Sequence, residues 1–86
     1  MNFVSWDFNA SAGSTVSMTI DRQANVFLVD DTNFSSFRRG GTFNYYGQLQ
    51  KHRGVRLTVP RTGHWHLVLQ PVGGTVRYSE PQILGN

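Results

Sequence analysis

The strongest constraint on the fold is a series of short segments in which apolar and polar residues alternate. Apolar side chains occupy every second position of residues 3–8, 16–20, 55–59 and 64–70. This period of two is typical of strands with one face in a core and the other in solvent. Residues 25–29 are more continuously apolar and also predict a strand. No segment keeps a 3.6-residue apolar period across three turns, so we expect almost no helix.

Composition favours the same fold class. Val and Thr are common, 13% of the residues are aromatic, and there is no cysteine to supply a disulfide or a thiolate zinc site. The prediction is an all-β, small single-domain sandwich or open barrel of about six or seven short antiparallel strands. We expect one domain over residues 1–79 and a loose C-terminal tail over residues 80–86. Residues 16–20 and 25–29 are predicted to form a hairpin, and residues 75–79 a last strand.

The segment from Asp30 to Lys51 has a different character. It combines Arg, Gly, Ser and Asn with five aromatic residues and keeps neither periodicity. We interpret it as a long ordered aromatic/Arg loop with a short strand at residues 43–46. Loops of this length in a compact domain usually carry function or are disordered, and the aromatics argue against disorder.

Charge is distributed unevenly along the chain. Most of the acidic residues lie in residues 1–31, whereas residues 32–79 contain seven Lys or Arg and no acid, and the net charge is +3. This asymmetry favours an anionic partner, although a basic face can also serve only solubility. No apolar run is long enough to span a membrane and no signal peptide opens the chain, so a cytoplasmic location without membrane contact is expected.

The residues that could carry catalysis are few. The sequence has no nucleophile elbow, no phosphate-binding loop and no dinucleotide fingerprint, so we expect no enzyme and no cofactor. His64 and His66 lie at i and i+2 on a predicted strand and would share one face. A third metal ligand could come from His52, Asp30 or Asp31, but none has diagnostic spacing. We therefore favour two histidines that hydrogen-bond to neighbouring loops and expect no bound metal.

The predicted ligand site combines guanidinium groups, aromatic rings and imidazoles. Arginines beside aromatic rings suit nucleotides or single-stranded nucleic acid. The expected ligand-binding residues are Asn33, Phe37, Arg38, Arg39, Tyr45 and Tyr46, with His64 and His66 nearby. The alternative is structural: the aromatics fix the loop on the sheet, and Arg38 pairs with Asp30 or Asp31. Trp65, on the face of Leu67 and Leu69, is expected in the core.

Several of these segments together resemble a known family. The elements are Asn25–Phe34, Phe37-Arg38 with Gly40, Tyr45-Tyr46-Gly47, Leu57–Pro60 and Thr62–His66. Their order resembles a small bacterial domain of unknown function, family eighteen-eighty-three. The resemblance implies a β-rich fold, found as a stand-alone protein or joined to TIR domains, and it implies no activity or cofactor.

The leading hypothesis is a non-enzymatic binding module for a small anionic, nucleotide-like ligand, linked through the resemblance to TIR-type signalling. A first alternative is sequence-independent nucleic-acid binding by the basic segment. A second is a protein–protein module whose exposed aromatics form a homo-oligomer interface. A third is a metal-dependent enzyme that uses His64 and His66.

Overall fold

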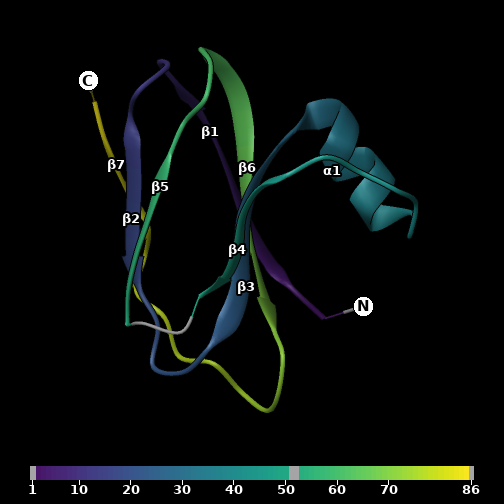
Figure 1. Cartoon of the computed structure of the whole chain (residues 1–86), viewed down its shortest axis with the longest axis vertical. Coiled ribbons are helices and arrows are strands. Elements are labelled where there is room, and N and C mark those ends of the chain that lie inside the picture. The colour runs from purple at the N-terminus through teal and green to yellow at the C-terminus, as the bar shows by residue number, and fades with distance from the viewer. Residues whose placement is uncertain (1, 51–52, 86) are drawn as a thin grey trace.

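The computed structural model describes residues 2–50 and 53–85 (Figure 1). These residues form two facing antiparallel sheets and a helix on the outer side of the larger sheet. Sheet A has the strand order β1 (Val4–Ala10), β6 (Gly63–Pro71), β3 (Ala24–Asp30) and β4 (Tyr46–Gln50). Sheet B has the order β5 (Gly54–Thr58), β2 (Thr15–Thr19) and β7 (Gln82–Leu84). The predicted all-β sandwich of short antiparallel strands is confirmed.

The main core lies between the two sheets. On β6 it takes Trp65, Leu67 and Leu69, the face that the alternation predicts, and Trp65 is only 1% exposed. Strand β3 is buried on both faces, because Val26 faces sheet B while Phe27 faces the helix. Burial on both sides explains why this strand is continuously apolar in sequence rather than alternating.

The helix α1 (Asp31–Arg38) corrects the prediction of a long loop without regular structure. Asp30 caps it, because its Oδ1 atom accepts a hydrogen bond of 2.8 Å from the backbone N–H of Asn33. Phe34 and Phe37, three residues apart, face sheet A, and Phe37 is 3% exposed. Two apolar positions in eight residues are too few for the period of a helix to stand out in the sequence.

Two further expectations about the strands are wrong. Residues 16–20 and 25–29 do not form a hairpin, because β2 lies in sheet B and β3 in sheet A. The apolar pattern of each segment identifies it as a strand but does not determine which strand it pairs with. Residues 75–79 form no strand, although Tyr78 makes an isolated bridge.

The C-terminal segment and the middle strand also differ from the expectation. The stretch predicted as a loose tail contains β7, which pairs with β2. The strand expected at residues 43–46 starts only at Tyr46. Within the described residues, no helix has both the length and the apolar character needed to cross a bilayer.

Candidate functional site

A group of polar side chains meets where β3 ends, α1 begins and β6 starts. In the sheet register Asp7 of β1 is the partner of His66, and His66 is also the partner of Val29 on β3. His64 lies two residues before His66 and projects from the same face of β6. Asp31 is the first residue of α1, directly after β3. The fold thus brings together residues that lie more than thirty positions apart in the chain.

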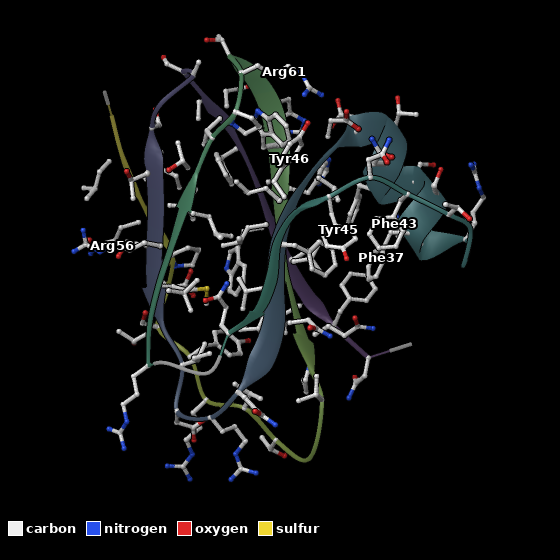
Figure 2. All side chains as sticks on the ribbon, viewed as in Figure 1. Phe37, Phe43, Tyr45, Tyr46, Arg56 and Arg61 are labelled. Atoms are coloured by element: carbon white, nitrogen blue, oxygen red, sulfur yellow. The ribbon has the colours of Figure 1, made fainter. Side chains whose placement is uncertain are left out.

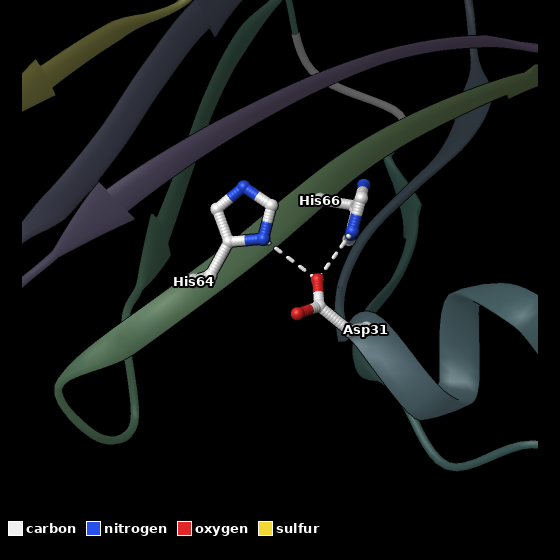
Figure 3. A group of neighbouring side chains, drawn as sticks. All are labelled: Asp31, His64 and His66. Atoms are coloured by element: carbon white, nitrogen blue, oxygen red, sulfur yellow. Dashed lines mark hydrogen bonds and ion pairs between the residues drawn. The ribbon is translucent and has the colours of Figure 1, made fainter.

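The carboxylate of Asp31 lies between the two imidazoles (Figure 3). Its Oδ1 atom is 2.7 Å from Nδ1 of His64 and 2.8 Å from Nε2 of His66. One ligand atom from each of these three residues lies within 4.8 Å of the other two. We call these three residues the Asp31–His64–His66 cluster.

Two further side chains fix the imidazole rings. Nε2 of His64, the ring nitrogen that faces away from Asp31, lies 3.0 Å from Oδ2 of Asp7. The ring of His66 stacks on Phe34, with centroids 4.1 Å apart and an interplanar angle of 6°. A carboxylate behind one imidazole and an aromatic ring beside the other restrict the orientation of both rings.

The charges in the cluster shift the protonation of its members. Hydrogen bonds to Asp31 and then to Asp7 raise the pKa of His64 above its ordinary value of 6.5. Both ring nitrogens of His64 face carboxylate oxygens, and only the protonated imidazolium can donate to both. Hydrogen bonds from His64 and His66 lower the pKa of Asp31 below its ordinary value of 3.8.

Asp30 and Asn33 hold the start of the helix beside the cluster. Hydrogen bonding from the Asn33 backbone N–H is the main cause that lowers the pKa of Asp30. The other oxygen of Asp30 accepts a 2.7 Å hydrogen bond from Nη2 of Arg61. Asn33 donates to Asp30 through Nδ2 and accepts from the backbone N–H of Asn44 through Oδ1. Asn33, expected to bind ligand, therefore has structural hydrogen bonds on both ends of its amide.

The structure does not bring the expected ligand-binding residues to one surface, and three of them, Phe37, Tyr45 and Tyr46, can be followed in Figure 2. Phe37 is buried under the helix. Tyr45 packs on Phe27 on the helix side of sheet A, whereas Tyr46 packs edge-on against Trp65 of the main core. Only His64 and His66 of the expected set meet in one polar group.

The two loop arginines lie at the end of α1, far along the helix from its capped start. Arg38 is the last helical residue and Arg39 is the C-cap. The guanidinium of Arg38 lies 5.8 Å from the ring centroid of Phe34. The pairing of Arg38 with Asp30 or Asp31, part of the structural alternative, is wrong, because the ion pairs described for those carboxylates are with Arg61 and the two histidines.

Sequence reasoning missed Asp7 and selected Asp31 only as one of three candidates. The available signal was positional: Asp31 directly follows the strand that pairs with the His-containing strand. Recognising it required the register of β3 against β6, which pattern analysis did not supply.

One family model matches this chain. It is the model of a domain of unknown function, DUF1883, and it matches residues 1–82 of the 86 residues. The chain therefore belongs to this family, which confirms the resemblance seen in the sequence. No curated protein and no solved structure gives a significant match. The family's description assigns no function, so ligand binding, a TIR link and a bacterial cytoplasmic location stay predictions.

Proposed function

We propose that this protein is a metal-binding module in which the Asp31–His64–His66 cluster holds one divalent transition-metal ion. The observation that carries the proposal is the convergence of Nδ1 of His64 and Nε2 of His66 on one oxygen of Asp31, at 2.7 and 2.8 Å. The sequence-based expectation of no metal rested on the lack of an identifiable third ligand. In the proposed site, Asp31 is the third ligand.

An ion between the three ligand atoms requires all three side chains to move. Metal–ligand bonds in a tetrahedral zinc site are about 2.0–2.1 Å, which separates neighbouring ligand atoms by about 3.3 Å. The two imidazole nitrogens, which lie up to 4.8 Å apart, would therefore approach each other by as much as about 1.5 Å, and the Asp31 oxygen would retreat from each of them by about half an ångström. The side chain of Asp31 is 66% exposed at the first turn of α1, so this movement meets little packing resistance.

The contacts that the two imidazoles make besides those to Asp31 are typical of metal-bound histidines. Imidazoles that bind metal through one nitrogen commonly donate the other N–H to a carboxylate, which fixes the tautomer and raises the basicity of the ligand. Asp7 occupies that position for His64, at 3.0 Å from Nε2. For His66, the stacked ring of Phe34 fixes the orientation of the imidazole.

The local charge also favours a cation. Three carboxylates, those of Asp7, Asp30 and Asp31, lie in this region, and among the described residues only Arg61 is paired with one of them as a permanent cation. With neutral histidines the sum is about −2, which outweighs the opposing partial charge of about half a unit at the start of α1. A divalent ion neutralises the group.

The donor set selects the kind of metal. Two imidazole nitrogens and one carboxylate oxygen suit zinc, cobalt, nickel or iron(II), whereas magnesium and calcium prefer oxygen ligands throughout. Three protein ligands leave at least one coordination position for water or another ligand, the arrangement of catalytic rather than structural sites. The proposal is limited to binding, because no group in the cluster is placed to act as a separate base.

Titration of the metal-stripped full chain with zinc in a calorimeter tests the proposal. We expect one ion per chain, proton release that reflects the deprotonation of His64, and little binding of magnesium. His66→Ala and Asp31→Ala should each weaken zinc binding by more than about a hundredfold, and Asp7→Asn by about ten- to a hundredfold. Asp21→Asn, a matched loss of charge outside the cluster, should leave zinc binding unchanged. Zinc binding that survives both ligand substitutions would refute the assignment.

A further inference from the structure

A small depression opens beside the Asp31–His64–His66 cluster. Its volume is about 290 Å³, and its lining includes Asp31, Thr32, Arg61, Thr62 and His64. We propose that a small oxyanion, a carboxylate or a phosphate group, binds here with one oxygen on the open position of the metal ion and another on the guanidinium of Arg61. This inference rests on the proposed metal site and adds the class of ligand that it takes.

Arg61 is held in place and still has donors to offer. Its Nη2 atom lies 2.7 Å from Oδ2 of Asp30, and its guanidinium carbon lies 4.8 Å from the ring centroid of Trp65. The contact from Nη1 to the hydroxyl of Tyr46 is long, at 3.4 Å. The side chain is nevertheless 55% exposed. A guanidinium has five N–H donors in a planar fork, so two contacts leave several for a carboxylate or phosphate.

The charges of the site imply that the metal ion binds first and the anion second. Without metal, the three carboxylates of Asp7, Asp30 and Asp31 outnumber the two cations, the guanidinium of Arg61 and protonated His64, and this region repels an anion. A divalent ion cancels the excess and offers direct coordination at an open position. Anion binding should therefore require the metal, whereas metal binding should not require the anion.

The size of the depression limits the ligand. Pockets for drug-sized ligands usually occupy about 300–1,000 Å³, and this one is at the lower end. It accommodates a carboxylate or phosphate group and the few atoms attached to it. The hydroxyls of Thr32 and Thr62 in the lining are further donors to such a group. A nucleotide would be held by its phosphate, with the nucleoside outside.

The experiment uses the cobalt(II)-loaded full chain, because the visible absorption of cobalt reports changes in its coordination. Acetate, inorganic phosphate and adenosine monophosphate are titrated separately in a non-coordinating buffer. We expect acetate and phosphate to change the spectrum with saturation, and the nucleotide to bind no more than about tenfold more tightly than phosphate. Much tighter nucleotide binding would show that the ligand is a nucleotide and would overturn the small-oxyanion assignment.

Substitutions of Arg61 distinguish the contribution of its guanidinium to phosphate binding from the contribution of the metal. Arg61→Gln should weaken phosphate binding by at least about tenfold, the scale of a lost charge-assisted hydrogen bond, while cobalt still binds. Arg61→Lys should lose part of the affinity because the planar fork is absent. Arg56→Gln is the matched control and should bind phosphate as the wild type does, since Arg56 lies on β5 in sheet B and projects away from Arg61 (Figure 2).

The outcomes distinguish this inference from the metal site itself. If cobalt binds and no anion alters its spectrum, or if Arg61→Gln binds phosphate as tightly as the wild type, the oxyanion site is refuted and the metal site stands. If phosphate binds the metal-free chain equally well, the dependence on metal is refuted. If cobalt does not bind at all, the proposed function and this inference both fail.

Discussion

Asp30→Ala tests how the sequence positions the start of the helix. The substitution removes the N-cap, in which Oδ1 accepts from the backbone N–H of Asn33 at 2.8 Å and from its Nδ2 at 2.9 Å. It also removes the 2.7 Å ion pair with Arg61. Replacing an Asp N-cap by Ala costs about 0.5–2 kcal/mol. The lost ion pair adds only about 0.2–1 kcal/mol to this cost, because the side chains of Arg61 and Asp30 are 55% and 29% exposed.

We therefore expect Asp30→Ala to lower the free energy of unfolding by about 0.7–3 kcal/mol. For a domain of this size, Tm falls by about 4–8 °C for each kcal/mol. Asp30→Asn is the matched control. Asn caps helices as well as Asp does but cannot form the ion pair, so its cost should stay below about 1 kcal/mol.

Urea unfolding of the wild type and both variants, with chelator present, measures these differences. The capping account predicts a clear gap between Asp30→Ala and Asp30→Asn. Equal destabilisation by the two variants would show that the charge of Asp30, and not the cap, holds the helix. A change of less than about 0.3 kcal/mol in Asp30→Ala, well under the usual cost of a lost cap, would refute the reasoning altogether.

Trp65→Ala should destabilise the fold by about 3–5 kcal/mol and leave little folded protein, because the ring is fully buried between the sheets, as a thermal melt will show. Gly47→Ala should cost about 1–3 kcal/mol in urea unfolding, because the new Cβ would lie 2.5 Å from the backbone oxygen of Val26 at a φ of +134°. The metal-free protein should lose stability as pH rises from about 6.5 through the raised pKa of His64, because protonated His64 stabilises the fold fully only below that range. Asp31→Asn should flatten this pH profile of urea unfolding, and an unchanged profile would contradict the pairing of His64 with Asp31.

The sequence predicts those parts of the fold that alternation alone determines. Strands that present one face to the core, such as residues 64–70, are recognisable because every second residue is apolar. Which strand pairs with which is a different question. An apolar pattern fits a strand in either sheet, so residues 16–20 and 25–29 could be recognised as strands but not assigned to separate sheets. The short helix escaped detection because its cap, Asp30, and two Phe residues are its main signals.

The candidate site was predictable in part for the same reason. His64 and His66 share a face of one strand, which follows from their spacing alone. Their contacts with Asp31 and Asp7 depend on the alignment of β6 with its two neighbours, β1 and β3. The predicted Arg/aromatic site assumed that nearby residues in sequence face the same way. Tyr45 and Tyr46 instead lie on opposite faces of sheet A, as adjacent residues entering a strand do.

The most direct test of the metal site is long-range ¹H–¹⁵N NMR of the imidazole nitrogens during zinc titration of the full chain. The account predicts that the metal binds Nδ1 of His64 and Nε2 of His66, and that Nε2 of His64 keeps its proton for Asp7. The ¹⁵N shifts of those two binding nitrogens should then change in step up to one equivalent of zinc. Unchanged shifts at both rings, or zinc on Nε2 of His64, would contradict the proposed centre.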